Sequence, residues 1–514
     1  MIFAADTDAD LSPKLPFMKH ISLIFWGYFL AISAFSQSIV YVTPTGAGDH
    51  SGNTWSNALS GVQLPNRVAT ADSGTQFWIA AGTYKPTTTT NRTASFSIAS
   101  GVSVYGGFAG TETALEQRIF GSNETVFSGD IGNIEYPGDN SMHVITLFNA
   151  RQTISLNSLT IQGGQIRYSS DLESSGAGIL IDITSDTLSV SVTSCRFINN
   201  TINGSLTGGG AIAVITHANS HCNVTIKNCH FSNNIAGFGG AYTPQTLGGT
   251  ITSLLENSDF IANEGLNESG AISNRYVTDS PLNSLTIRKC NFFSNKAQFS
   301  GGAITSGYGQ CLLENCVFNS NSVLSAQYTF GGGAVDNSES KVVFKNCIFI
   351  NNIAPYGGAV FSAPSTKTTY QKFINCIFSR NSANVSGGVF YDRIRQPFLG
   401  NHATITTLMN CIIWENSAPD SFSSILSATY SLIQNGYSGI GNLNSDPLFV
   451  DPANGNFRLQ PSSPAINAGS PDITDLLPTD IAGNPRVQGN RVDMGAYEFI
   501  DCSICPPFII SRIR

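Results

Sequence analysis

A unit of about 30 residues repeats along the middle of this chain, and the repeat constrains the fold more than any other feature. Between residues 195 and 416, the frame Cys-x-Phe-x-x-Asn occurs eight times in steps of 26 to 35 residues, and most copies are followed by Gly-Gly-Ala or a close relative. Repeats of about 20–50 residues predict a solenoid or a similar array. The intact copies are Cys195/Phe197/Asn200, Cys229/Phe231/Asn234, Cys290/Phe292/Asn295, Cys316/Phe318/Asn321, Cys347/Phe349/Asn352 and Cys376/Phe378/Asn381, and the degenerate copies are Ser258/Phe260/Asn263 and Cys411/Ile413/Asn416.

Each unit has the pattern of short extended strands. Cys and Phe two positions apart point to the same side of a strand, and runs such as 223–229, 284–290 and 341–347 alternate apolar and polar residues. About three strands per unit, stacked on the next unit, predict an all-β fold: a right-handed, single-stranded parallel β-helix with capping segments at both ends. A β-propeller is disfavoured because its blades need about 40–45 residues.

The repeated frame is interpreted as architecture rather than as a redox, metal or phosphate site. Stacked coils would place each Phe over the next Phe, so that the rings fill the interior with the thiols beside them as small hydrophobes. Asn fits a left-handed turn, and its amide can bond to the copy one coil away. A buried pattern that recurs in every unit is what the core of a solenoid requires.

Composition narrows the class of protein further. Only 12% of the 514 residues are charged, against about 25% in an average globular protein, and 50 are glycine. This suits a β-rich surface covered by Ser, Thr and Asn. The net charge of −8 offers no basic stripe, so nucleic acid is not an expected partner.

Residues 1–37 are interpreted as an upstream extension followed by a signal peptide. From Met18 the chain has a basic start, an apolar run over 21–35 and the small-x-small sequence Ala34-Phe35-Ser36, the pattern of a cleaved secretory signal. We expect translation to begin at Met18 and the mature chain to begin near Gln37. The protein is then exported, either secreted or held at the cell envelope or outer-membrane surface, with no transmembrane helix after cleavage, because no other segment is long and apolar enough.

The repeats carry a resemblance to a known family. The alternation of Gly-Gly-Ala-Ile or -Val with Phe-x-x-Asn, over roughly Gly176 to Asn416, resembles the polymorphic outer-membrane protein repeats of bacterial surface adhesins. The flanks are similar to secreted parallel β-helix proteins of Bacteroidota and related bacteria. Residues 41–59, 77–86 and 104–118 resemble their entry module, and residues 445–470 and 480–499 resemble a closing module of the choice-of-anchor type. The resemblance implies a pectin-lyase-like solenoid.

These patterns divide the chain into five parts. After residues 1–37, residues 38–165 form an N-terminal cap with the first coils, 166–430 form the β-helix repeats, 431–499 form a capping module, and 500–514 form a short tail that matches no sorting or anchoring domain. Terminal units of a solenoid must be atypical in order to cover the end of the core, and the prolines of 431–499 would stop parallel strand pairing.

The cysteines and histidines leave minor alternatives open. We expect most ladder thiols to be reduced and buried, because parallel stacking gives poor disulfide torsions. Cys502 and Cys505 form a lone C-x-x-C, for which a redox or metal role is the alternative to a plain tail. His217, His221 and His230 cluster in sequence with Cys222, and we interpret them as surface or turn residues, with a metal site as the alternative.

The best catalytic candidates in the sequence are Tyr391, Arg393 and Arg395, beside Asp392 in the stretch Tyr-Asp-Arg-Ile-Arg. A polysaccharide lyase needs such a base and a cation near the uronate, but no acidic cluster lies in register on neighbouring copies, and an exposed charged strand or loop is the favoured interpretation. A hydrolase needs paired carboxylates, and the acids of the repeats recur at no shared position. No cofactor is expected. Calcium at Asp446 and Asp451 is the alternative to turn residues.

Two classes of function follow from these patterns. The favoured one is an exported stalk or adhesin-like protein that binds extracellular glycans or neighbouring surface proteins without catalysis, at a surface expected beside the longer loops at 200–209 and 321–332. The alternative is a secreted polysaccharide lyase or glycoside hydrolase on the same fold. Fold alone cannot decide between them, because function belongs to sites grafted on a fold.

Overall fold

The computed structural model describes residues 38–119, 121–167, 175–275, 283–326, 330–364, 366–393, 402–418 and 426–501. The predicted signal peptide at 18–36, Arg395 and the Cys502/Cys505 pair lie outside these residues. Within them, the protein has no helix that is both long enough and apolar enough to cross a bilayer.

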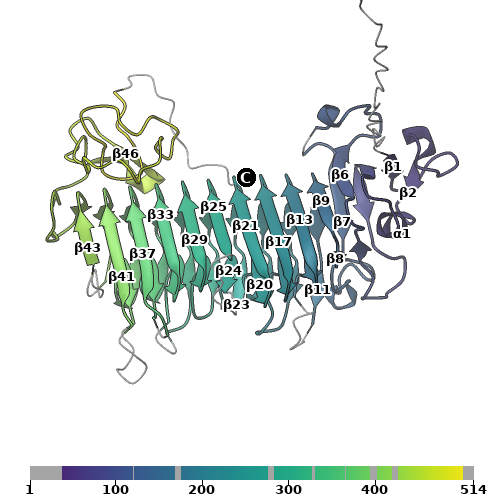
Figure 1. The fold of residues 1–514 in the computed structure, drawn as a ribbon, viewed down its shortest axis with the longest axis horizontal. Coiled ribbons are helices and arrows are strands. Elements are labelled where there is room, and N and C mark those ends of the chain that lie inside the picture. Colours follow the sequence, from purple (N-terminus) through teal and green to yellow (C-terminus); the bar gives the residue numbers. More distant parts are fainter. Residues whose placement is uncertain are drawn as a thin grey trace, which may run out of the picture. The chain divides into compact units, whose positions relative to one another are not determined.

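The described strands form four long sheets in which all neighbours are parallel, as Figure 1 shows for the stacked coils of sheet A. Sheet A holds β1 (Ile39–Thr43), β2 (Leu59–Ser60), β3 (Gln76–Ala80), β6 (Ser103–Phe108), β9 (Gln152–Asn157), β13 (Asp186–Thr193), β17 (Ser220–Lys227), β21 (Thr250–Glu256), β25 (Ser284–Arg288), β29 (Gln310–Glu314), β33 (Lys341–Lys345), β37 (Thr369–Ile374), β41 (Thr404–Met409) and β43 (Leu426–Thr429). Sheet B holds β4 (Gly82–Tyr84), β7 (Thr125–Ser128), β10 (Thr160–Gln162), β14 (Arg196–Ile198), β18 (His230–Ser232), β22 (Asp259–Ile261), β26 (Asn291–Phe293), β30 (Val317–Asn319), β34 (Ile348–Ile350), β38 (Ile377–Ser379), β42 (Ile412–Trp414) and β44 (Leu432–Ile433).

The other two long sheets complete each coil. Sheet D holds β11 (Gln165–Ile166), β15 (Thr201–Ile202), β19 (Ile235–Phe238), β23 (Glu264–Glu268), β27 (Lys296–Ala297), β31 (Ser322–Val323), β35 (Ile353–Tyr356) and β39 (Ser382–Ser386). Sheet C holds β5 (Phe96–Ser97), β8 (Ile145–Phe148), β12 (Ile179–Ile183), β16 (Ile212–His217), β20 (Tyr242–Leu247), β24 (Ile272–Arg275), β28 (Ile304–Gly307), β32 (Val335–Ser338), β36 (Val360–Ser362) and β40 (Phe390–Asp392).

One coil runs through sheets A, B, D and C in that order and returns to sheet A one strand further along, as β17 to β21 illustrate. The predicted fold class, a right-handed parallel β-helix, is confirmed. Each coil has four strand segments rather than three. The additional one is the sheet D segment after the Asn, which at two to five residues is too short to show an alternating pattern.

The interior contains two continuous side-chain columns. Seven fully buried phenylalanines stack face to face, with ring centroids 4.7 to 4.9 Å apart: Phe197, Phe231, Phe260, Phe292, Phe318, Phe349 and Phe378. In the asparagine column, the Asn234 Nδ2 donates to the Phe197 carbonyl and to the Asn263 Oδ1, both at about 3 Å. The Asn234 Oδ1 accepts from the main chain and the amide of Asn200.

The later copies repeat the same contacts. The Asn295 Nδ2 donates to the Phe260 carbonyl at 2.8 Å and to the Asn321 Oδ1 at 3.0 Å. The Asn381 Nδ2 likewise donates to a Phe carbonyl at 2.8 Å and to the Asn416 Oδ1 at 2.9 Å. These amides are buried with their hydrogen bonds made, which is what a low-dielectric interior demands.

The left-handed turn conformation lies one residue earlier than the sequence predicts. The residue before each ladder Asn has a positive φ, for example Asn351 at 54° and Arg380 at 58°. The prediction that the ladder Asn itself takes this conformation is wrong, because its amide serves the interior hydrogen-bond column instead. The correction applies to the six fully buried asparagines of the intact copies: Asn200, Asn234, Asn295, Asn321, Asn352 and Asn381.

A second set of residues with positive φ precedes the ladder Cys positions and includes Asn346 at 54°. These residues lie on the turn between sheets A and B. Their side chains therefore point outward, at the edge where sheets A and B meet.

The thiol position has a polar role as well as an apolar one. The Cys347 Sγ donates to the Lys345 carbonyl at 3.4 Å, and in the degenerate copy the Ser258 Oγ donates to the Glu256 carbonyl at 2.9 Å. Burial raises the pKa of the ladder thiol Cys290, which keeps it protonated. The described cysteines are buried free thiols: Cys195, Cys222, Cys229, Cys290, Cys311, Cys316, Cys347, Cys376 and Cys411.

The remaining elements lie at the two ends of the β-helix. At the N-terminal end are the 3-10 turn η1 (Trp55–Asn57), helix α1 (Leu64–Ala69), η2 (Leu115–Gln117) and η3 (Pro137–Asp139). At the C-terminal end, after β44, the hairpin of β45 (Phe449–Asp451), η7 (Pro452–Asn454) and β46 (Asn456–Leu459) begins a module with few strands. Figure 1 shows this module above the strand ends near β33.

Candidate functional site: a groove on the outer face of sheet B

The outer face of sheet B changes character halfway along the β-helix. In each sheet B strand the middle residue points inward to the Phe column, so the first residue points outward, and the register places these first residues in one column. The column runs through Thr160, Arg196, His230, Asp259 and Asn291, and continues as Val317, Ile348, Ile377, Ile412 and Leu432. It is polar in the first half and apolar in the second.

The apolar half is covered by the C-terminal module, which we define as residues 445–499. One buried cluster joins the two surfaces. Ile348, Ile377 and Ile412 in this cluster are at most 1% exposed although they lie on the outside of the coil. Burial of such aliphatic side chains is the main force that holds the module against the sheet. The module contributes Phe449, Phe457, Leu459, Ala465, Met494, Ala496 and Tyr497.

Asparagines on the turn between sheets A and B hold the main chain of the module. The Asn375 Nδ2 donates to the carbonyls of Asp493 and Gly495 at 3.3 and 3.2 Å. The Asn410 Oδ1 accepts from the Ser470 main chain at 2.7 Å, and the Asn346 Nδ2 donates to the Thr479 carbonyl at 2.9 Å. These three asparagines, one from each of three successive coils, therefore hold the module at a fixed position along the β-helix.

A buried polar network lies at the centre of the module. The Arg486 Nη1 donates to the Glu498 Oε1 at 2.8 Å, and both side chains are at most 2% exposed. Arg486 also donates to Asn346 of the β-helix and to the carbonyls of Gly495 and Ala496. Burial raises the pKa of Glu498 to about 8, and neighbouring Asp493 raises it further while Arg486 lowers it. Because Arg486 bonds both to Glu498 within the module and to Asn346 on the β-helix, this network holds the module against the coils.

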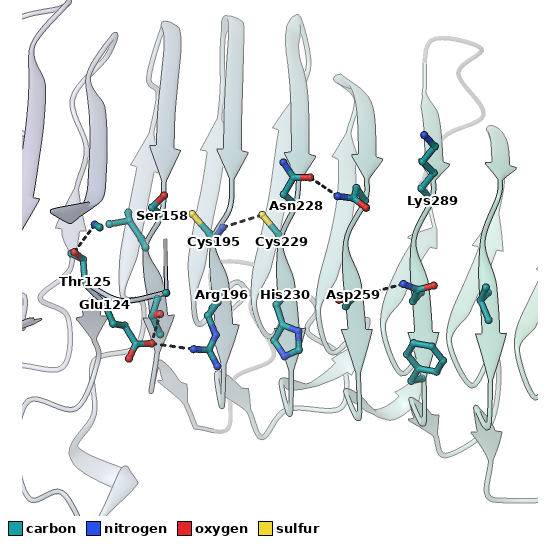
Figure 2. Close-up of a pocket in the computed structure, with 18 of the residues that line it drawn as sticks. Glu124, Thr125, Ser158, Cys195, Arg196, Asn228, Cys229, His230, Asp259 and Lys289 are labelled. Atoms are coloured by element: carbon teal, nitrogen blue, oxygen red, sulfur yellow. Dashed lines mark hydrogen bonds and ion pairs between the residues drawn. The ribbon is translucent and has the colours of Figure 1, made fainter. Parts of the chain in front are cut away.

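The polar half of the column is open and lines a groove of about 940 Å³. Figure 2 shows two rows of side chains along it. The lower row lies on sheet B and on Glu124, the residue before β7, and the upper row lies on the turn between sheets A and B. The figure labels Glu124, Arg196, His230 and Asp259 in the lower row, and Ser158, Asn228 and Lys289 in the upper row. By their places in the chain, Thr160 and Asn291 of sheet B belong to the lower row, and Asn257 and Asn315 on the turn belong to the upper row.

Hydrogen bonds and one ion pair fix most of the lower row. The Arg196 Nη1 lies 3.3 Å from the Glu124 Oε1, which also accepts from the Thr160 hydroxyl at 2.8 Å. The Asn291 Nδ2 donates to the Asp259 Oδ1 at 2.8 Å. This row therefore presents both donors and acceptors, one residue on each strand at a spacing of about 4.8 Å.

His230 lies on the strand between those of Arg196 and Asp259. Burial lowers the pKa of its imidazole, and the Arg196 charge lowers it further while the Asp259 charge raises it. The ring is therefore neutral near pH 7, with one nitrogen as a donor and the other as an acceptor. Among the described residues, neither the His230 ring nor the Lys289 ammonium has a hydrogen-bond or ion-pair partner. Both groups are available to a ligand.

The groove is better arranged for binding than for bond cleavage. Its two carboxylates, Glu124 before β7 and Asp259 on β22, have β10, β14 and β18 between them, and each already accepts hydrogen bonds. Paired-carboxylate hydrolysis needs the two groups about 5–9.5 Å apart on either side of the scissile bond. In the described part of the chain, no three His, Cys, Asp or Glu side chains gather closely enough to hold a metal ion.

The catalytic candidates from the sequence lie on a different face. Tyr391 is on the outer face of sheet C, with its ring centroid 4.9 Å from Tyr356 and 5.8 Å from Phe361. The Arg393 guanidinium lies 5.3 Å from the Phe330 ring centroid. Asp392 between them is buried, and burial raises its pKa to about 7. The structure brings Tyr391 and Arg393 into an aromatic cluster rather than into the groove.

The other predicted residues are also separate from one another. His217 bonds to Asp182 at 3.0 Å, His221 bonds to Thr250 at 2.7 Å, and His230 alone of the three lies in the groove. The loop at 200–209 contains β15 and leads from sheet D to sheet C, so it does not line the groove either.

The calcium candidates occupy local turns of the C-terminal module. The Asp446 Oδ1 accepts from the Leu448 main chain at 2.8 Å. Asp451 caps η7 by accepting from the Asn454 main chain and side chain. These carboxylates satisfy turn N–H groups, as Asp and Asn commonly do at such positions.

The groove is not among the sites predicted from the sequence, although one signal in the repeats indicates it. The residue after each ladder Cys is Arg, His, Asp or Asn in the first four copies, and Val or Ile in the last four. An outward position that changes from polar to apolar along a solenoid indicates that one half meets solvent and the other half meets another part of the protein.

Solved structures that are similar to this chain include two lyases. No protein-family model and no curated protein matches the chain. A structure described as pectate lyase Pel9A is 14% identical, with a TM-score of 0.41 over 90% of this chain and 96% of that chain. A rhamnogalacturonan lyase is 13% identical, with a TM-score of 0.37 over 86% of this chain and 96% of that chain. Identity this low carries no information about activity.

Proposed function

We propose that this protein is an exported β-helix that binds a polysaccharide along the open groove of sheet B without cleaving it. The observation that carries the proposal is the pair of rows along the groove of about 940 Å³. Most of their side chains are polar, and the charged ones lie singly among uncharged ones. These groups follow one another at the strand spacing of about 4.8 Å, so a ligand with many hydroxyl groups along its length can make a hydrogen bond at each strand.

The chemistry of the groove favours a sugar polymer over other ligands. Amides such as Asn228 and Asn257, the neutral imidazole of His230 and the Asp259 carboxylate can donate to or accept from hydroxyl groups. A duplex or single-stranded nucleic acid would need a basic surface, and the lower row carries two carboxylates and only one cation, Arg196.

Export is the second part of the proposal. It rests on the signal-peptide pattern at 18–36 and on the resemblance of the repeats to bacterial surface proteins. Cell fractionation tests it: we expect the mature chain to begin near Gln37 and to be found outside the cytoplasm. An uncleaved cytoplasmic pool as the main species would contradict export.

The binding part is tested by affinity gel electrophoresis against pectate, alginate, xylan and laminarin. We expect at least one of them to retard the wild-type protein, and His230→Ala to weaken that binding about fivefold to tenfold, the size of one or two lost hydrogen bonds. His221→Ala is the matched control, because His221 lies on sheet A outside the groove.

The same incubations distinguish binding from catalysis. Unsaturated products or new reducing ends that disappear in Tyr391→Phe or in Arg393→Ala would show the alternative function, a polysaccharide lyase or hydrolase. If none of the four polymers retards the protein, or if His221→Ala weakens binding as much as His230→Ala, the proposed site is wrong.

A further inference from the structure

The groove has a wall at each end. At the N-terminal end it is lined by Gly107 of β6 and by Gly121 and Asn123, which lie between β6 and β7. At the other end it is lined by Phe293 and Val317 of sheet B, together with Ile481 and Tyr497 of the C-terminal module. The Tyr497 side chain is 3% exposed and packs in the cluster that holds the module.

Five strands lie between these walls. The polar outward residues come from β10, β14, β18, β22 and β26, and four strand spacings of about 4.8 Å give a length of about 19 Å. Beyond β26 the outward column becomes Val317 and Ile348, which are buried under the module. The hydrogen-bonding rows therefore stop where the module begins.

We infer that the C-terminal module sets the length of ligand that the groove accepts, with Tyr497 and Ile481 as the specificity-determining wall. This inference rests on the proposed function and adds the class of ligand to it: a short oligosaccharide, or the end of a longer chain, rather than a polymer that runs along the whole β-helix. A ligand that grows beyond about 19 Å gains no further contact with the rows.

The experiment titrates the whole protein by calorimetry with oligomers of galacturonic acid, of mannuronic acid and of xylose, each from dimer to decamer. For the series that binds, we expect Kd to fall with length and then to become constant. Ile481→Trp adds bulk to the wall and should bring the constant region to a shorter oligomer. Tyr497→Ala with Ile481→Ala opens the wall but adds no hydrogen-bonding strand beyond it, so the decamer should bind with a Kd within about twofold of the wild-type value.

Two controls separate the wall from general damage to the module. Tyr497→Phe keeps the ring and should leave the length dependence unchanged. Tyr430→Ala removes the ring that lies 5.2 Å from the Arg491 guanidinium, outside the groove, and should change stability without changing the length dependence.

The outcomes also separate this inference from the proposed function. If the wild type binds one series but Kd continues to fall through the decamer, and Ile481→Trp behaves like the wild type, then the wall is wrong and the binding groove stands. If no series binds, the proposed function is overturned, and the inference with it.

Discussion

The open and covered halves of sheet B differ in their outward residues and share the Phe and Asn columns beneath them. In the open half the column presents Arg196 and His230 to a groove, and in the covered half it presents Ile348 and Ile377 to the C-terminal module. Inside, the same Phe and Asn columns run under both halves without interruption. One backbone therefore supports two surfaces, and one residue per coil decides which surface forms.

This comparison teaches where function lies in a solenoid. Interior columns are constrained by stacking, so they are alike in every coil whatever the protein binds. The outward column is free of that constraint, and it carries the difference between a ligand groove and an intramolecular interface. Substitutions of outward-facing residues should therefore change stability by different amounts in the two halves, and substitutions of inward-facing residues should change it by similar amounts.

The largest effect is expected from Arg486→Ala in the covered half. The substitution leaves the carboxyl groups of Glu498 and Asp493 without their neighbouring cation, and it removes the hydrogen bonds to Asn346 and to two main-chain carbonyls. Loss of these hydrogen bonds from a buried side chain, with the partner groups left unpaired, costs about 3 kcal/mol or more. Limited proteolysis and urea unfolding should show release of the module, while Arg196→Ala in the open half changes stability by less than about 1 kcal/mol. Equal losses in both variants would break the comparison.

The covered half should also respond to pH. The pKa of Glu498 is raised to about 8 in the folded protein from 4.5, so the folded state binds the proton more tightly than the unfolded state. Its contribution to stability is then complete below about pH 4.5 and is lost as pH rises through 8, a change of about 3 kcal/mol between pH 5 and pH 8. Urea titrations at these two pH values should show weaker module attachment at pH 8. A module that is more stable at pH 8 would contradict the sign.

Ile377→Ala tests the apolar interface itself. The Ile377 side chain is 1% exposed under the module, and truncation of a buried aliphatic side chain costs about 2–3 kcal/mol when the site closes partly around the gap. The matched change in the open half is His230→Ala, which should cost less than about 0.5 kcal/mol because the ring faces the groove. Thermal unfolding measures both. A cost for His230→Ala as large as that for Ile377→Ala would mean that the groove is part of the packed structure.

The smallest difference is expected between two inward positions. Asn234→Ala lies under the open half and Asn352→Ala under the covered half, and both residues make the same set of bonds to a Phe carbonyl and to the next Asn. Each substitution leaves buried main-chain groups unpaired and should cost about 2 kcal/mol. We expect the two unfolding free energies to agree within experimental error. A much larger cost at Asn352 would show that the module depends on the ladder beneath it.

The sequence predicts the fold because the interior columns repeat. Cys, Phe and Asn at fixed spacing are local signals, and in a solenoid each local position stacks on the same position one coil away. The left-handed backbone conformation before each ladder Asn is harder to predict from the sequence, because residues as different as Asn351 and Arg380 adopt it.

The candidate site is harder to predict, for two physical reasons. Arg196, His230 and Asp259 share no chemistry, so the column appears only when the register of the coils is known. The groove also ends where a distant part of the chain folds back over the sheet. The residues around Val317 give no indication that Tyr497 belongs to the same buried cluster.

Tyr391 and Arg393 show the opposite case. They attract attention as an aromatic and a charged residue in one short stretch, which is a pattern that sequence alone makes visible. In the structure they pack against the rings of Tyr356, Phe361 and Phe330 on sheet C. Proximity in sequence therefore says little about a shared site in a solenoid, where neighbours in space are about 30 residues apart.

The most direct test of the central claim is a histidine footprint of the open groove. The rate of modification by diethyl pyrocarbonate can be followed by mass spectrometry at each histidine, with and without the polysaccharide of the panel that binds best. His230 lines the groove, whereas His217 and His221 do not, so they serve as internal controls. We predict that bound polysaccharide slows modification of His230 severalfold and leaves the two controls unchanged. An unchanged rate at His230 while the polysaccharide is bound would contradict the claim.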